Sequence, residues 1–284
     1  VGESGCGKST TANVMCGLQA PTSGKVYFKG KDVTKRTAED RRHMGRVISV
    51  VFQNPATALN PRMVVREQLL DPMRVHNLGT EAEQEKRVKE LLELTGLPSS
   101  AAEVLPGQLS GGQRQRVAIA RALSLNPDAI IADEPTSALD VSVRAQILNL
   151  LTDLKKELGL AMVFISHDIQ TERYISDRIV VMKDGVVQQI ATPQEVFNHP
   201  ANIFVAGFIG VPQMNFFDAQ LVRSGNGFTV KTEDMNVALA PETCAQLALN
   251  WDGGDVKEIT AGVRPEQILL ADKGEEGALQ GTVE

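Results

Sequence analysis

The chain has 284 residues, of which 42% are hydrophobic and 23% charged, and this average composition excludes a disordered or fibrous protein. The formal net charge of −6, from 29 basic and 35 acidic side chains, excludes the chain-wide basic surface that nucleic-acid binding would require. No apolar run is long enough for a membrane-spanning helix. The cysteines, Cys6, Cys16 and Cys244, are too few for a disulfide framework and match no metal-ligand spacing, which predicts a protein of the reducing cytosol.

The first motif is a glycine-rich loop, GESGCGKST at residues 2–10, followed by a predicted helix that ends near Gly17. Its glycines allow backbone N–H groups to turn toward a phosphate, and the helix N-terminus favours the same anion. Lys8 would contact the β- and γ-phosphates, and Ser9 would offer its hydroxyl to Mg²⁺. The alternative interpretation is an ordinary glycine-rich turn before a helix.

Such a loop normally follows a strand, so we expect a chain truncated before Val1. The expected missing strand would lie beside Ala129–Ala132, and its absence would weaken both folding and ATP binding. We also expect truncation at Glu284, because a strand begins at about Ala278–Val283.

The following elements are predicted from apolar patterning and capping signals. We expect strands at Lys25–Phe28 and Arg46–Phe52 and a helix at Val64–Leu70. Thr80 and Glu83 form a capping box, which opens a helix that Gly96 and Pro98 terminate.

A second capping box, Ser110 with Gln113, begins another helix, and a short buried strand follows at Ala129–Ala132. Asp140 can cap a long amphipathic helix that extends to about Leu158. A further strand at Leu160–Ser166 and a hairpin over residues 178–190, turning at Asp184 and Gly185, complete this region.

Alternating apolar strands and amphipathic helices up to about residue 200 predict an α/β domain with a largely parallel sheet. After Phe216 the pattern changes to short strands, at Phe228–Lys231 and Val256–Val263, separated by turn residues. The change predicts a second, small all-β domain at residues 201–284, incomplete at its end.

The strand at Ala129–Ala132 leads directly into two carboxylates, Asp133 and Glu134. Open α/β sheets bind ligands at the carboxyl ends of their strands. Asp133 would hold Mg²⁺, and Glu134 would act as the general base for an attacking water. Taken alone, two acidic residues after a strand are common and carry little specificity.

The segment LSGGQ, at residues 109–113, begins a helix with two glycines, so its backbone N–H groups are open to an anion. The chain therefore contains two phosphate-binding helix starts. They can serve one nucleotide if two copies pair head to tail.

These motifs together resemble the ATPases of ABC transporters. GESGCGKST, Gln53 in VVFQNP, LSGGQRQRVAIARAL, IIADEPTSALD and FISHD occur in the order typical of that family, over residues 1–200. The resemblance implies a P-loop nucleotide-binding domain with a helical subdomain at about residues 54–125. The C-terminal domain is similar to the regulatory oligonucleotide-fold domains of some importers.

The resemblance implies ATP and Mg²⁺ as ligands and a role for each matching residue. The catalytic residues would be Glu134, His167 and Gln53, and the metal-binding residues Ser9, Gln53 and Asp133. Gln53 would also link the site to the transmembrane partner. The nucleotide-binding residues would be Gly2, Glu3, Ser4, Gly5, Cys6, Gly7, Lys8, Ser9 and Thr10, with Ser110, Gly111, Gly112, Gln113 and Asp140 acting across a dimer interface.

The resemblance further implies a homodimer or a paired ATPase subunit at the cytoplasmic face of the membrane. The helical subdomain would receive a transmembrane permease, which in turn works with a solute-binding protein, and no nucleic acid is expected. A soluble non-transport ABC ATPase is a less favoured alternative, because the chain has neither a second cassette nor a long coiled coil. A purely regulatory module is disfavoured by the intact Lys8, Asp133, Glu134 and His167.

Two resemblances point to different substrates. VVFQNPATALNPRMVV, PTSALDVSVRAQILNLL and RYISDRI are similar to importers of di- and oligopeptides. PANIFVAGFIGVPQMNFFDA and GVRPEQI are similar to ATPases of carbohydrate and glycerol-phosphate importers. The resemblance changes from peptide importers to carbohydrate importers near Ser176–Gly185. The chain is therefore either a natural hybrid or a product of joining two sequences. We favour carbohydrate or glycerol-3-phosphate import, because a whole domain is harder to acquire than loop similarity, and keep peptide import as the alternative.

Overall fold

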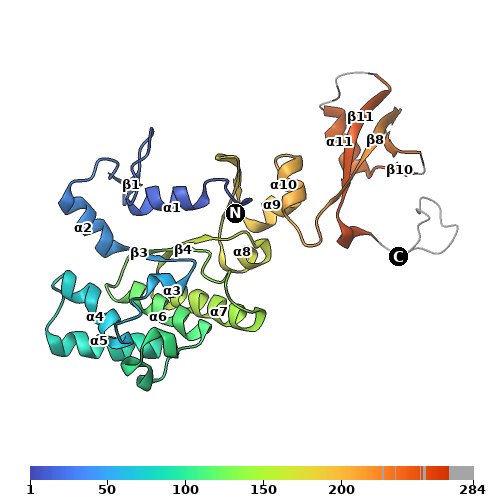
Figure 1. Ribbon diagram of the computed structural model, residues 1–284. Helices are drawn as coiled ribbons and strands as arrows, with labels where there is room; N and C mark the ends of the chain where they lie inside the picture. Colours follow the sequence, from blue (N-terminus) through green and yellow to red (C-terminus); the bar gives the residue numbers. More distant parts are fainter. Residues whose placement is uncertain (226, 234, 250, 252–253, 269–284) are drawn as a thin grey trace. The chain divides into compact units, whose positions relative to one another are not determined.

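The computed structural model describes residues 1–268, apart from residues 226, 234, 250 and 252–253 (Figure 1). The chain divides into two compact units, Val1–Val196 and Phe197–Glu284. The strand expected near Ala278–Val283 lies outside the described residues.

The first unit contains most of the described helices and a parallel sheet. In chain order its elements are α1 (Lys8–Cys16), β1 (Tyr27–Phe28), β2 (Lys31–Asp32), α2 (Ala38–Val47), β3 (Ile48–Val51), α3 (Pro55–Ala58), α4 (Val65–Val75), α5 (Glu81–Leu94), the 3₁₀ turns Ser99–Glu103 and Pro106–Gln108, α6 (Gly111–Leu123), β4 (Ala129–Asp133), α7 (Val141–Glu157), β5 (Ala161–Ile165), α8 (Ile169–Ile175), β6 (Ile179–Lys183) and β7 (Val186–Ala191). Helix α9 (Pro193–Asn198) crosses the boundary between the units.

The parallel sheet is confirmed, with strand order β3-β4-β5. Alternate residues of β4 face opposite layers: Ile131 packs with α1, whereas Ile130 and Ala132 belong to the core formed with α6 and α7. The expectation of a missing strand beside Ala129–Ala132 is wrong, because β4 is hydrogen-bonded to β3 on one edge and to β5 on the other.

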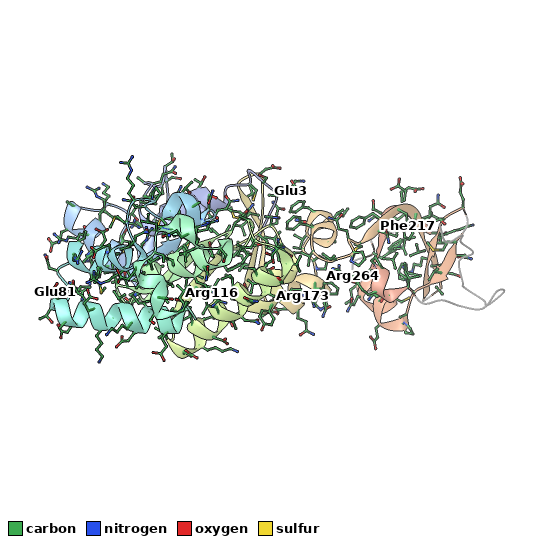
Figure 2. The ribbon with its side chains drawn as sticks, turned by 60° about the horizontal axis from the view of Figure 1, so that its bottom comes forward. Glu3, Glu81, Arg116, Arg173, Phe217 and Arg264 are labelled. Atoms are coloured by element: carbon green, nitrogen blue, oxygen red, sulfur yellow. The ribbon has the colours of Figure 1, made fainter. Side chains whose placement is uncertain are left out.

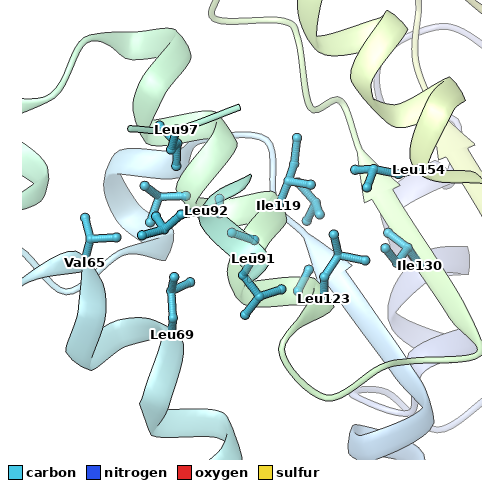
Figure 3. Packing of buried hydrophobic residues seen from close by; sticks show 14 of the residues in the cluster. Val65, Leu69, Leu91, Leu92, Leu97, Ile119, Leu123, Ile130 and Leu154 are labelled. Carbon is cyan, nitrogen blue, oxygen red and sulfur yellow. The ribbon is translucent and has the colours of Figure 1, made fainter. Parts of the chain in front are cut away.

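Helices α4, α5 and α6 share one hydrophobic core, shown in Figure 3. Leu69, Leu91 and Ile119, from one helix each, are fully buried in it. Helix α5 begins at the predicted capping box of Thr80 and Glu83. Helix α4 extends past its predicted end and past Pro72, because Met73 continues the buried face one turn beyond Leu69.

Helix α2 replaces the beginning of the predicted strand at Arg46–Phe52, which starts only at Ile48. Thr37 and Asp40 form a complete capping box at its N-terminus. Only Met44 of this helix is buried, so apolar periodicity gives almost no signal for it. By contrast, the hairpin of β6 and β7 is confirmed, and it turns at Asp184 and Gly185, both with positive φ.

The second unit contains an antiparallel sheet of order β10-β9-β8-β11, which confirms the β-domain. Its elements are α10 (Ile203–Phe208), β8 (Asn215–Ser224), β9 (Gly227–Lys231), β10 (Asn236–Ala238), α11 (Pro241–Leu249), β11 (Val256–Val263) and the 3₁₀ turn Pro265–Gln267. The unit is not entirely β, because α11 packs Cys244 against Leu221 and Phe228 of the sheet. Cys244 is the only buried residue of α11, so periodicity did not predict this helix.

Candidate nucleotide-binding and catalytic site

The loop at residues 2–7 leads into α1 without a side-chain cap. Gly7, the N-cap residue, has φ 93°, and the first N–H groups of α1 are therefore open to an anion. Gly2 approaches β6 so closely that a Cβ there would lie 2.3 Å from the carbonyl oxygen of Met182. The loop needs glycine at this position for close backbone contact.

Lys8 folds back over the loop that precedes it. Its Nζ donates hydrogen bonds of 2.8 Å to the carbonyl oxygens of Gly2 and Glu3, and it lies 3.9 Å from Sγ of Cys6. The side chain is 9% exposed. The ammonium group is thus held at the centre of the loop, where it can exchange carbonyl partners for phosphate oxygens.

Asp133 lies at the carboxyl end of β4, and the Ser9 hydroxyl is near enough to influence the pKa of its carboxyl. Burial raises the pKa of the Asp133 carboxyl, and the adjacent charge of Glu134 acts in the same direction, while the Ser9 hydroxyl and Lys8 oppose the shift. A hydroxyl beside a carboxylate is the oxygen donor set that suits Mg²⁺ bound to substrate phosphates. Among the described residues, no group of three or more His, Cys, Asp or Glu is placed so that it could hold a metal ion.

Glu134 is the point at which three predicted catalytic residues meet. Its carboxylate accepts a 3.0 Å hydrogen bond from Nε2 of Gln53 and lies 3.4 Å from Nδ1 of His167. Its backbone has φ 45°, a strained conformation for a residue other than glycine, and its N–H donates to the carbonyl of Ile165. Residues from the ends of β3, β4 and β5 are thereby collected at one edge of the sheet.

Ser110 and Gln113 complete the predicted capping box of α6. Next to it, a Cβ on Gly112 would lie 2.6 Å from Cγ1 of Val143, so the start of α6 packs directly on α7. Asp140 caps α7 by accepting from the N–H of Val143, and this bond, with a second from the Ser142 hydroxyl, lowers the pKa of its carboxyl.

Within the part of the chain that the structure describes, no hydrogen bond joins residues 110–113 or Asp140 to the phosphate loop. The predicted residues therefore form two groups: residues 2–10 with Gln53, Asp133, Glu134 and His167, and residues 110–113 with Asp140.

Sequence reasoning missed Arg144 and Asp168. Arg144 lies in the first turn of α7, and its Nη1 is 3.4 Å from Oδ2 of Asp168, the residue after His167. Their only signal in the sequence is proximity to Asp140 and His167. Nothing in their spacing predicts that they meet.

Comparisons with known proteins show similarity to ATPases of ABC transporters. The family model "ABC transporter" matches residues 1–137, and the model "MalK OB fold domain" matches residues 210–268. The oligopeptide transport ATP-binding protein AppF of Bacillus subtilis is 45% identical over 210 residues, which cover 74% of this chain and 64% of AppF. The dipeptide transport ATP-binding protein DppF of Escherichia coli is 41% identical over 216 residues, covering 76% of this chain and 65% of DppF.

Solved structures are similar over about two thirds of the chain. The ATP-binding cassette MJ0796, in a dimeric post-hydrolysis state bound to ADP and Pi, is 38% identical, with a TM-score of 0.61 over 68% of this chain and 83% of that one. CbiO1 of Clostridium perfringens, part of the ABC transporter complex cbiONQ, is 33% identical, with a TM-score of 0.65 over 71% of this chain and 78% of that one.

The phosphate loop, the carboxylates after β4 and these likenesses define a P-loop ATPase fold of the cassette type. The chain belongs to the ABC transporter family of ATP-binding cassettes. It spans less than two thirds of the length of AppF and DppF. None of the helices described is both long enough and apolar enough to cross a membrane.

Proposed function

We propose that the chain binds Mg-ATP at residues 2–10 and hydrolyses it with Glu134 as the general base. The observation that carries this proposal is the Glu134 carboxylate, fixed by Gln53 and near His167 at the edge of the sheet beside Asp133. A carboxylate held on both sides has a defined direction toward an attacking water, which is the main requirement of phosphoryl transfer.

In this mechanism Lys8 leaves the carbonyl groups of Gly2 and Glu3 and binds the β- and γ-phosphates of ATP. Glu134 accepts a proton from water, the water oxygen attacks the γ-phosphorus, and the bond to the ADP oxygen breaks. Ser9, Asp133 and Gln53 would hold Mg²⁺, which when bound neutralises phosphate charge. His167 would contact the γ-phosphate.

The second group of residues would act in a head-to-tail dimer. Ser110, Gly111 and Gly112 would close on the ATP of the other subunit, with Asp140 at the interface. The dimeric state of the similar cassette MJ0796 supports this arrangement.

Glu134→Gln is the direct test. The glutamine keeps the size of the side chain and one acceptor oxygen but cannot accept the proton, so turnover should fall at least about a hundredfold. ATP affinity should be unchanged, and the dimer should accumulate with ATP in sedimentation experiments. Lys8→Ala is the complementary variant, in which ATP affinity itself should be lost. Undiminished turnover in Glu134→Gln would refute the general-base role.

We further propose that the ATPase drives a peptide importer. Identity of 45% to AppF and 41% to DppF over about three quarters of the chain supports peptide import, which sequence analysis kept as the alternative, better than carbohydrate import. Carbohydrate or glycerol-3-phosphate import remains the second candidate, favoured by the MalK-type match at residues 210–268. Uptake of labelled dipeptide, maltose and glycerol-3-phosphate by a strain lacking this chain distinguishes the two.

A cavity of about 530 Å³ on the first unit is our proposed docking place for the permease. The cavity is lined by His43 and Arg46 of α2, Met73 of α4 and Arg87 of α5. It therefore lies between α2 and the helices α4 and α5. Arg46→Glu, at an exposed lining residue of the cavity, should abolish uptake in cells while leaving the ATPase activity of the purified chain intact. Normal uptake with this variant would place the permease elsewhere.

A further inference from the structure

Arg144 contacts two segments of the candidate site at once. Its Nη1 donates to Oδ2 of Asp168 at 3.4 Å, and its Nη2 donates to the carbonyl oxygen of Leu139 at 3.5 Å. Asp168 directly follows His167, and Leu139 directly precedes Asp140. One guanidinium group therefore joins the segment that carries His167 to the loop that carries Asp140.

Asp168, which accepts from Arg144, is itself held in place by hydrogen bonds. The N–H of Asp168 donates to Oγ of Ser166 at 2.8 Å, and Oδ2 of Asp168 accepts from Oγ1 of Thr171 at 2.9 Å. The side chains of Arg144 and Asp168 are only about one third exposed, at 33% and 34%. This pair is therefore less screened by solvent than an ordinary surface ion pair.

Arg144 also borders the reacting groups. A cavity of about 20 Å³, large enough for one water molecule, is lined by Glu134 and His167 together with Arg144 and Asp168. Nε of Arg144 is buried and has no hydrogen-bond partner among the residues that the structure describes. Arginine presents several donors in one rigid plane and so holds two acceptors in a fixed relative geometry, whereas the single Nζ of lysine, on a more flexible chain, fixes that geometry less well.

We propose that Arg144 is a positioning residue for ATP hydrolysis. It fixes the position of the segment that carries His167 relative to the loop that carries Asp140. A movement of Asp140 at the subunit interface therefore also moves His167, which lies beside Glu134. The inference rests on the proposed function and adds a residue to it. Arg144 acts through Asp168 and Leu139 and does not itself touch the nucleotide.

The test compares Arg144→Met, Arg144→Lys and Asp168→Asn in the full chain. Because misplacement of a catalytic group costs about tenfold to a hundredfold, kcat should fall by that amount in Arg144→Met. The Kd for Mg-ATP should stay within about twofold of the wild-type value, and the Hill coefficient for ATP should fall toward one. Arg144→Lys should recover part of kcat, and the double variant Arg144→Met/Asp168→Asn should be no worse than the worse single variant.

Lys155→Met is the matched control on the same helix. Lys155 Nζ also bridges a carboxylate and a carbonyl, at 2.6 Å from Oδ2 of Asp177 and 3.2 Å from the oxygen of Ile175, but neither borders Glu134 or His167. Its loss should lower thermal stability and leave kcat and the Hill coefficient unchanged. Equal loss of kcat in Lys155→Met and Arg144→Met, or normal kcat and Hill coefficient in Arg144→Met, would overturn the inference. A wild-type chain without Mg-ATP hydrolysis would overturn the proposed function as well.

Discussion

Lys8 and Asp133 are ionisable side chains with little access to solvent, and their surroundings differ. Lys8 donates to two carbonyl oxygens, whereas Asp133 has the carboxylate of Glu134 as its neighbour. Because burial raises the pKa of Asp133 in the folded state, the folded protein binds this proton more tightly than the unfolded chain does. The resulting stability is fully present below the unfolded value of 3.8 and is lost as the pH rises through the folded pKa.

Asp133→Asn should therefore melt at a higher temperature than the wild type at pH 7 without Mg²⁺. The difference should shrink as the pH falls through the folded pKa and disappear well below 3.8, where Asp133 is protonated in both states. Hydrolysis of Mg-ATP should be lost in the same variant. The measurement is Tm against pH in the absence of nucleotide.

Asp177→Asn is the control of opposite sign. Lys155 lowers the pKa of the exposed Asp177, so this variant should lose slightly in Tm at pH 7 and match the wild type at low pH. A lower Tm for Asp133→Asn at pH 7 would contradict the assignment of burial as the dominant influence.

At the scale of elements, the start of α6 is fitted against the start of α7. Gly111 and Gly112 occupy adjacent positions with very different clearance: a Cβ would lie 3.7 Å from Cδ2 of Leu139 in the first case and 2.6 Å from Cγ1 of Val143 in the second. The first distance is an ordinary van der Waals contact, and the second requires a neighbour to move.

Gly112→Ala should lower the free energy of unfolding by about 1–3 kcal/mol, because the added methyl overpacks this contact. Gly111→Ala, the matched control, should change it little. Val143→Ala should rescue Gly112→Ala by removing the clashing methyl. Urea denaturation measures all three, and equal effects of the two glycine substitutions would refute the packing argument.

The same elements indicate how far the sequence predicts the fold. The capping boxes at Thr80 and Ser110 are local, since two side chains and two backbone N–H groups within one turn decide them. Helices α2 and α11 each bury a single side chain, so apolar periodicity could not identify them.

The contact of Gln53 with Glu134 was not predictable from spacing, because the two residues are 81 positions apart and parallel β-pairing brings them together. Only the resemblance to a family assigned them to one site. The expectation of an unpaired edge beside Ala129–Ala132 was likewise mistaken, because strand order is a property of the assembled sheet and not of any single strand.

At the scale of the whole molecule, two units with separate cores share one chain. The second unit has an internal anchor in Arg264, labelled in Figure 2. This residue is 5% exposed, donates to the carbonyl oxygens of Ile209 and Phe197 at 2.7 and 2.6 Å, and lies 3.7 Å above the Phe197 ring. The segment at residues 197–209 is thereby fixed to the end of β11.

Trp251, the only tryptophan, packs 4.9 Å from the ring of Phe228 and therefore reports on the second unit. Arg264→Met should lower the unfolding midpoint seen by its fluorescence, corresponding to about 2 kcal/mol or more for the lost charged hydrogen bonds. Helical circular dichroism, dominated by the first unit, should keep its midpoint.

Mg-ATP at a hundred times its Kd should shift the circular dichroism midpoint and not the fluorescence midpoint, because it stabilises only the first unit, by about 2.7 kcal/mol. Coincident shifts of both signals would mean that the units unfold as one.

The left-handed backbone of Glu134 has a consequence for how this chain can change over generations. Glycine at that position would relieve about 1 kcal/mol or more of strain, and it would also remove the carboxylate that Gln53 and His167 contact. Selection for stability and selection for turnover therefore oppose each other at this residue. A lineage released from the need to hydrolyse ATP would be expected to lose Glu134 early and to become more heat-resistant as it did so.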